Sequence, residues 1–106
     1  MQDDYENAIN NICIFGEFVA KELSKKINKK NVDFKTAMNL INNYKMKANT
    51  KINYNFLGSV LYPIYYCRNQ KLHPYSKIDI DEFLAELLFT NLSSIIDYLE
   101  ENKIKL

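Results

Sequence analysis

The sequence predicts an all-α domain built from four helices. Two Gly and two Pro in 106 residues leave few positions for the tight turns of a β-sandwich or barrel. Apolar residues instead recur at three- and four-residue steps along most of the chain, which is typical of helices with one buried face. A chain of this length suits a single domain, residues 1–106, and is small enough to gain stability from a dimer interface. The aromatic content of 13% favours such a partner surface, so we expect a dimer.

The first predicted helix runs from Asp4 to about Ile27 and ends at a polar break over residues 28–31. The second helix follows, and Asp33 is expected to cap its N-terminus. The apolar stripe of the first helix comprises Tyr5, Ala8, Ile9, Ile12, Phe15, Val19, Leu23 and Ile27, and that of the second comprises Phe34, Ala37, Met38, Ile41 and Tyr44.

The basic and polar segment 45–55 is predicted to be a loop, and a third helix should begin near Asn55 and run toward Leu72. Pro63 interrupts this pattern, because a mid-helix proline kinks the axis, whereas a proline in a first turn begins a helix; both options stay open. The fourth helix is expected to start at a capping box formed by Asp79 and Glu82 and to end at Glu101. The packed faces comprise Leu57, Val60, Leu61, Ile64 and Tyr65 in the third helix, and Ile80, Leu84, Leu88, Leu92, Ile95 and Leu99 in the fourth.

Several classes of protein are disfavoured by what the sequence lacks. It has no run of 18 apolar residues, and its N-terminus begins with acidic residues instead of a basic segment, so neither a membrane span nor a signal peptide is predicted. Cys13 and Cys67 fall in helical patterns without CxxC spacing and are interpreted as two buried thiols. We therefore expect a cytoplasmic protein with no metal site and no cofactor.

The sole arginine, Arg68, and the sole histidine, His73, lie close together in a chain that otherwise uses thirteen lysines for positive charge. Only the guanidinium offers a planar fork that can bind a phosphate through two hydrogen bonds, and only the imidazole titrates near neutral pH. Five helical residues would place the two side chains about 140° apart around the axis. Pro74 disfavours helix at His73, so the third helix should end between Gln70 and His73 and let the imidazole turn back toward Arg68.

Charge is sorted along the chain although the net charge is only +1. Residues 1–23 carry −4, residues 24–78 carry +10 and residues 79–106 carry −5. The basic block contains Arg68 and His73, which indicates RNA as the ligand, since a local positive field attracts a phosphate backbone. Lys71 and Lys77 are candidates for additional phosphate contacts, and the alternative is that each is an ordinary solvated lysine.

The segment Arg68-Asn69-x-x-x-His73, preceded by an apolar helix and followed by a polar turn and a long helix, resembles the signature of the HEPN superfamily of helical domains. The resemblance implies a dimer in which both Arg–His pairs meet in one cleft, and a metal-independent endoribonuclease that acts as a toxin or phage-defence effector on single-stranded RNA. It also implies that Arg68 binds the scissile phosphate, that His73 assists proton transfer and that Asn69 orients the arginine or contacts RNA. An antitoxin or regulatory partner is implied as well.

Tyr75 completes an Arg-x4-His-x-Tyr pattern that is similar to HEPN toxins paired with a minimal nucleotidyltransferase antitoxin, which makes Tyr75 a candidate modification site. Its alternative role is a turn tyrosine that packs on the fourth helix. Two other functions stay open for the whole chain. One is a non-catalytic HEPN-like dimerisation or RNA-binding module. The other is a helical interaction domain in which Arg68 pairs with a carboxylate such as Asp79 or Asp81, and His73 caps a helix end.

Overall fold

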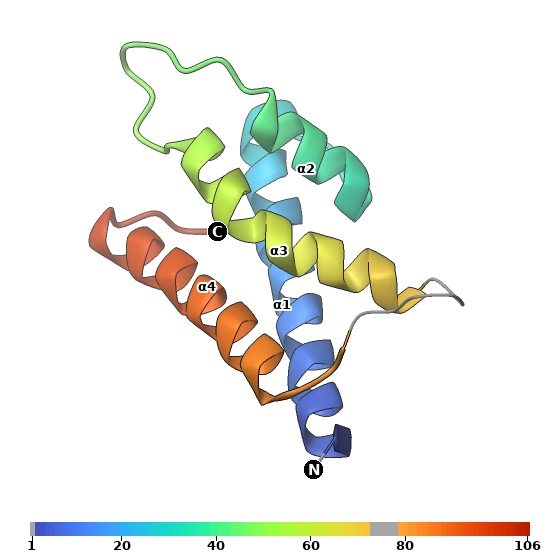
Figure 1. The fold of residues 1–106 in the computed structure, drawn as a ribbon. Helices are drawn as coiled ribbons and strands as arrows, with labels where there is room; N and C mark the ends of the chain where they lie inside the picture. The colour runs from blue at the N-terminus through green and yellow to red at the C-terminus, as the bar shows by residue number, and fades with distance from the viewer. Residues whose placement is uncertain (1, 73–78) are drawn as a thin grey trace.

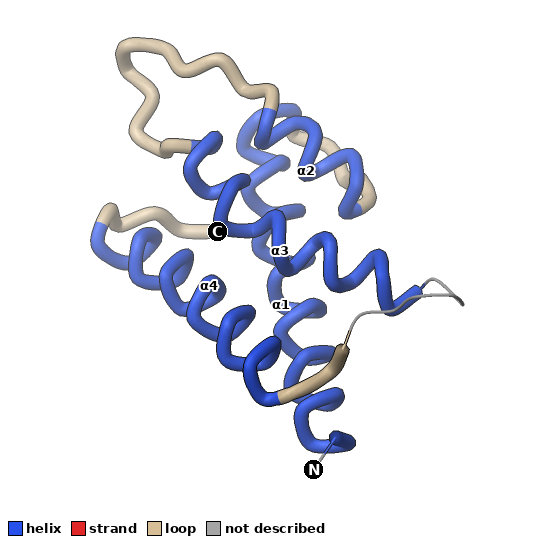
Figure 2. Tube along the Cα trace, viewed as in Figure 1, coloured by secondary structure: helices blue, strands red, loops and turns tan. Residues whose placement is uncertain are grey.

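The computed structural model describes residues 2–72 and 79–106, and within them it contains four α-helices and no strand (Figures 1 and 2). The helices are α1 (Gln2–Asn28), α2 (Phe34–Asn42), α3 (Tyr54–Leu72) and α4 (Glu82–Glu101). The all-α prediction is therefore confirmed for this part of the chain. None of the four combines the length with the apolar character that a membrane crossing requires.

The helices form two layers, with α1 on one side and α2, α3 and α4 on the other (Figure 1). The long helix α1 contacts each of the other three, and α3 lies between α2 and α4. Over the described residues, α2 and α4 do not contact one another. Helix α3 thus has neighbours on three sides, and its fourth side faces solvent.

Buried apolar side chains form two clusters along α1. The larger lies where the C-terminal half of α1 meets α2, the first half of α3 and the end of α4, and the smaller lies where the N-terminal half of α1 meets the second half of α3 and the start of α4. The larger cluster contains Val19, Ala20, Leu23, Phe34, Ala37, Met38, Ile41, Tyr54, Leu57, Leu61, Ile95 and Leu99, and the smaller contains Ile9, Ile12, Cys13, Ile64, Cys67, Leu88 and Leu92. Both cysteines are buried as predicted.

Two residues predicted on the buried stripe of the first helix lie elsewhere. Ala8 and Phe15 are exposed, and Ala8 lines an open hollow between α1 and α4. Phe15 instead contacts the ring of Phe18, with 6.1 Å between ring centroids. The periodicity of apolar residues marks a stripe wider than the surface that the neighbouring helices cover.

Pro63 lies inside α3, so the option that it begins a helix is wrong. Proline has no N–H, and the carbonyl one turn earlier, at Ser59, therefore loses its helical donor. The next carbonyl along the chain, that of Val60, accepts a hydrogen bond from another helix, because Asn91 of α4 donates its Nδ2–H to it at 3.1 Å. This hydrogen bond ties α4 to α3 at the proline.

The caps confirm one sequence prediction and correct another. Asp33 caps α2, since its Oδ1 accepts a hydrogen bond from the backbone N–H of Thr36 at 2.8 Å. Helix α4 is capped by Asp81 and not by Asp79, because Oδ1 of Asp81 accepts from the N–H of Leu84 at 2.9 Å. The predicted capping box of Asp79 and Glu82 is therefore wrong.

Tyr44 was expected on the second helix, but α2 ends at Asn42. The side chain of Asn55 supports this early end, since its Nδ2 amide, which has two N–H donors, lies within hydrogen-bonding distance of the carbonyl oxygens of Ile41, Asn42 and Tyr44. Tyr44 packs outside the helix, with its ring centroid 4.6 Å from that of Tyr54. The tyrosine covers the larger cluster from the loop.

Gly16 brings α1 and α3 into close approach. A Cβ atom at this position would lie 2.7 Å from Cγ2 of Ile64, which is closer than two carbon atoms can pack. The residue after Gly16 is Glu17, and Arg68 follows Ile64 by one helical turn. The absence of a side chain at Gly16 therefore helps to bring Glu17 within reach of Arg68.

Candidate nucleic-acid interface

Arg68 lies in the C-terminal part of α3, directly after buried Cys67. Its side chain is 33% exposed, and the next residue, Asn69, is exposed. Cys67 anchors this turn of the helix in the smaller cluster, so the two residues that follow are held at the surface by a packed neighbour. The chain thus presents its one guanidinium at a partly open position.

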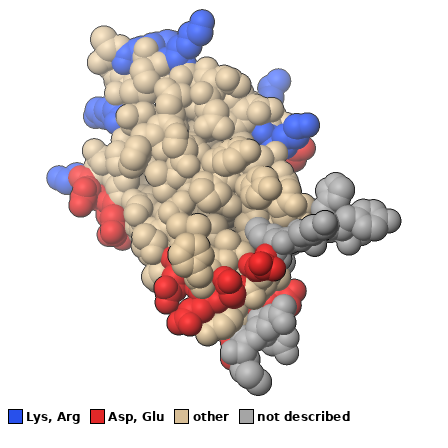
Figure 3. Space-filling view, viewed as in Figure 1, with Lys and Arg blue, Asp and Glu red and all other residues tan. Residues whose placement is uncertain are grey.

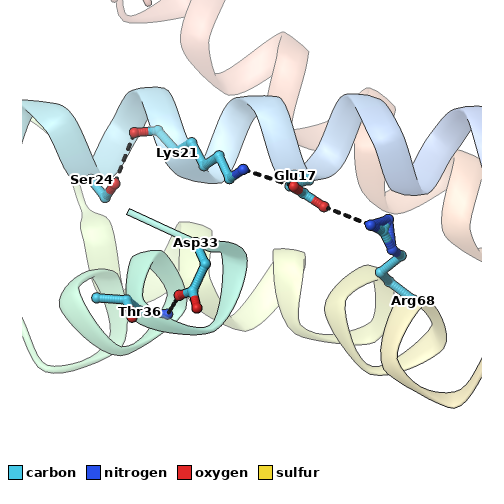
Figure 4. Close-up of polar contacts among 6 residues, drawn as sticks. All are labelled: Glu17, Lys21, Ser24, Asp33, Thr36 and Arg68. Atoms are coloured by element: carbon cyan, nitrogen blue, oxygen red, sulfur yellow. Dashed lines mark hydrogen bonds and ion pairs between the residues drawn. The ribbon is translucent and has the colours of Figure 1, made fainter. Parts of the chain in front are cut away.

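The partner of Arg68 is Glu17 of α1, at 3.4 Å between Nη2 and Oε1 (Figure 4). The other oxygen of Glu17, Oε2, lies 2.9 Å from Nζ of Lys21. One carboxylate therefore serves two cations, and its contact with the arginine is longer than the 2.7–2.9 Å of strong charge-assisted bonds. Exposed pairs of this kind contribute about 0.2–1 kcal/mol.

The interaction-domain alternative expects Arg68 to pair with a carboxylate such as Asp79 or Asp81. The arginine does pair with a carboxylate, but with that of Glu17 and not with either of these two examples. Asp81 is engaged in capping α4. Glu17 could not be identified from the sequence, because the contact depends on how α1 crosses α3.

Arg68 lines two hollows in the surface. One is formed with Ile14, Glu17, Phe18 and Lys21 of α1. The other is formed with Glu17, Asp33, Phe34, Lys35 and Asn69, and so lies between α1, the start of α2 and α3. Arg68 and Glu17 line both hollows, so the two adjoin one another at this ion pair.

The charges around Arg68 are nearly balanced. Among the described residues that line the two hollows, Arg68, Lys21 and Lys35 are cationic, and Glu17 and Asp33 are acidic. The hydrogen bonds that Asp33 accepts from Thr36 lower its carboxyl pKa below the usual 3.8, so this group stays ionised at neutral pH and is committed to its cap (Figure 4). The sorted charge is visible on the surface at larger scale, with lysine and arginine side chains over the loop after α2 and acidic side chains over the start of α4 (Figure 3).

The remaining predicted site residues fall largely outside what the structure describes. His73, Tyr75 and Lys77 belong to residues 73–78, which are not described, and neither is the side chain of Lys71. Helix α3 extends to Leu72, within the range predicted for its end. The structure therefore positions Arg68 and Asn69, and the expected convergence of His73 on Arg68 remains a prediction.

Two exposed groups of side chains lie on the helices that carry Arg68 and Glu17 and were not identified from the sequence. Tyr62 and Tyr66 lie on the solvent side of α3, and Ile14 and Phe18 lie on the outer side of α1. Each pair is spaced four residues apart, which places its members on one helix face. This spacing is present in the sequence, but it resembles a core stripe until the packing of the helices is known.

No cluster of metal ligands is found in the described part of the chain, where no three His, Cys, Asp or Glu side chains come together. Comparisons with protein-family models, with curated proteins and with solved structures find no match to this chain. The site is therefore interpreted from its own geometry and chemistry.

Proposed function

We propose that the chain is a metal-independent endoribonuclease of the HEPN type that acts on single-stranded RNA as a toxin or phage-defence effector. The observation that carries the proposal is the position of the sole arginine. Arg68 is partly open, is bound through one nitrogen to an oxygen of Glu17 at 3.4 Å, and is followed by exposed Asn69. A guanidinium with one long contact has donors left for a phosphate.

The proposed reaction uses the nucleophile that RNA carries. The 2′-oxygen attacks the adjacent phosphorus, the bond from phosphorus to the 5′-oxygen breaks, and the products are a 2′,3′-cyclic phosphate and a 5′-hydroxyl. Arg68 stabilises the added negative charge on the phosphate, and His73 assists the transfer of the proton to the leaving oxygen or holds the phosphate. Asn69 orients the guanidinium or contacts the RNA. DNA lacks the 2′-hydroxyl and is not cleaved.

A homodimer is part of this proposal and is supported by the surface beside the arginine. Ile14 and Phe18 are exposed side chains that line the same hollow as Arg68, and Phe15 continues the apolar surface of α1. Exposed apolar groups that adjoin one another favour a protein partner. A second copy that covers them would shield Arg68 from water and bring two sites together.

A specific observation also favours a different function. The pairing of Arg68 with Glu17 gives the arginine a structural role between α1 and α3, as expected of a helical interaction domain. The third possibility is the non-catalytic RNA-binding module. It would bind phosphate through the remaining N–H donors of Arg68, as the nuclease does, but would not use His73 for proton transfer. The three functions differ in what they do to RNA.

Cleavage of single-stranded RNA with EDTA present separates them. The nuclease is expected to lose activity in His73→Ala and Arg68→Ala while both variants keep the helical circular dichroism and urea unfolding of the parent. Arg68→Lys should also fail, since a point charge cannot replace a bidentate fork. If both alanine variants cut as fast as the parent, the site assignment is wrong. Salt-sensitive RNA binding without cleavage indicates the module, and neither activity indicates the interaction domain.

A further inference from the structure

Two tyrosine rings form an open aromatic surface on α3. Tyr62 is 51% exposed and Tyr66 is 49% exposed, although both rings are large enough to be favoured in a core. Their centroids lie 6.4 Å apart with 30° between the ring planes, so the two rings stack and each keeps open surface toward solvent. The two rings therefore leave aromatic surface open to solvent that the fold itself does not bury.

The rings are supported from below by the packed interior. The ring of Tyr62 contacts that of Tyr65 at 6.1 Å between centroids. Tyr65 in turn packs edge-on against Phe34 of α2 at 5.0 Å, and Phe34 is buried in the larger cluster. Tyr62 is therefore held in place through two further aromatic contacts. Binding to a ring that is already ordered costs less conformational entropy than binding that must first order the ring.

The stripe of tyrosines leads to Asn69, the residue after Arg68. Tyr62, Tyr66 and Asn69 are spaced at i, i+4 and i+7, which places them along one face of α3. Asn69 shares a hollow with Arg68 and with Lys35 at the start of α2. A ligand lying along this face would reach Asn69 about two helical turns, or roughly 10 Å, beyond Tyr62. Arg68 points toward α1 instead, so the ligand would have to turn around the helix at Asn69, through the hollow that this residue shares with Arg68.

The charge of this surface suits a nucleic acid. None of the 19 residues of α3 is acidic. Figure 3 shows largely uncharged surface over the middle of α3, with both blue and red side chains beside the N-terminal end of α2, where Lys35 and Asp33 line the hollow of Arg68. A neutral aromatic face can stack bases without repelling their phosphates.

We propose that Tyr62 and Tyr66 form a stacking platform for neighbouring bases of single-stranded RNA, which directs the strand past Asn69 to the hollow that Asn69 shares with Arg68. The inference rests on the proposed ribonuclease function and adds the position of the strand that such an enzyme would hold. Stacking accepts every base, because each has a π-face, so the platform gives affinity and strand placement with little sequence preference.

The platform is tested by binding, with RNA that cannot be cleaved. A short 2′-O-methyl oligoadenylate lacks the nucleophilic hydroxyl, and an abasic sugar-phosphate oligomer of equal length lacks the bases. Tyr62→Ala and Tyr66→Ala are each expected to bind the oligoadenylate roughly 5-fold to 150-fold more weakly than the parent. Binding of the abasic oligomer should not change. Tyr62→Phe should bind as the parent does, and Tyr62→Leu, which keeps bulk without a π-face, should bind as weakly as the alanine variant.

Phe83→Ala is the matched control, because Phe83 is an aromatic side chain with 73% exposure on a different helix, α4. It is expected to bind RNA as the parent does. The platform is refuted if the tyrosine-to-alanine variants bind the oligoadenylate unchanged, or if they lose the abasic oligomer equally. A change of oligomeric state in these variants by sedimentation would also refute it and assign the face to a protein partner.

The failure of the platform and that of the nuclease are distinguishable. A parent that cleaves RNA and whose tyrosine variants bind as it does rejects the platform alone. If Arg68→Ala cleaves as fast as the parent while the tyrosine variants bind weakly, the catalytic assignment falls and the platform stands. A parent that binds no single-stranded RNA rejects both.

Discussion

Glu17→Gln removes the carboxylate that competes with a phosphate for Arg68, so it should strengthen the binding of RNA. The carboxylate of Glu17 is 3.4 Å from the guanidinium and is also engaged by Lys21 at 2.9 Å. A phosphate that binds Arg68 must replace or share this contact. The neutral amide keeps the shape of the side chain and removes most of its attraction for the arginine.

The structure sets the size of this effect. The pair is partly exposed, with 33% of the arginine side chain and 22% of the glutamate side chain accessible, so solvent screens it. Such pairs are worth about 0.2–1 kcal/mol, which corresponds to RNA binding that is tighter by roughly 1.4-fold to 5-fold. The same contact supports the crossing of α1 and α3, and the free energy of unfolding should fall by no more than about 1 kcal/mol.

The assay is titration of labelled single-stranded RNA at low and at high salt, because the gain should shrink as salt screens the charges. Glu22→Gln is a matched control. Glu22 also lies on α1, is 24% exposed and pairs with a lysine, Lys25 at 3.0 Å, so it reports the general effect of removing one negative charge.

A gain confined to Glu17→Gln, and lost when Arg68→Ala is added, supports a phosphate site at the guanidinium. Equal gains in Glu17→Gln and Glu22→Gln would refute the reasoning, since only overall charge would then matter. A loss of stability in Glu17→Gln with no change in RNA binding would assign Arg68 to the structure alone.

Three further predictions concern the fold that holds the site. Gly16→Ala should lower the free energy of unfolding by roughly 1–2 kcal/mol, measured by urea, because the clash of a Cβ atom with Ile64 outweighs the gain in helix propensity; unchanged stability would show that the helices do not approach so closely. Asp81→Ala should lower the free energy of unfolding by about 1 kcal/mol, and Asp79→Ala should not change it measurably. A larger loss in Asp79→Ala than in Asp81→Ala would instead support the capping box expected from the sequence. The hydrogen bonds to Asp33 lower its pKa, so its carboxylate stabilises the fold above the unfolded value of 3.8, and this contribution is lost as pH falls through the lower folded value. The urea midpoint of Asp33→Asn should therefore depend less on pH in that acidic range than the midpoint of the parent does, and identical pH profiles would contradict the cause given for the shift.

The sequence predicted the four helices because each carries an apolar stripe, and it predicted the cap at Asp33 because that residue directly precedes one. It failed at the start of the fourth helix, where the local pattern favours the wrong residue. Asp79 has Glu82 three residues behind it, as a capping box requires, whereas Asp81 has Leu84 there, and the path of the chain into the helix nevertheless selects Asp81. The end of α2 was misplaced because the competing donor, Asn55, comes from another helix.

The candidate site, like the fold, was predictable from the sequence only in part. Arg68 was identifiable because it is the sole arginine in a lysine-rich chain, and its chemistry differs from that of lysine. Its partner Glu17 and the open faces of Tyr62 and Tyr66 depend on helix crossings, which residue patterns do not specify. Contacts between helices therefore had to come from the structure.

The lack of contact between α2 and α4 has a consequence for how the hollow at Arg68 could adapt to a ligand. One wall of this hollow, with Asp33, Phe34 and Lys35, belongs to the short helix α2 and the residue before it, while α1 and α3 supply the rest. A small tilt of α2 would widen or narrow the entrance and leave the seam between α3 and α4 intact. The width of the hollow thus depends on the position of α2, which has only nine residues. Helix α3, which carries the arginine, stays fixed to α4 through the hydrogen bond from Asn91 to Val60.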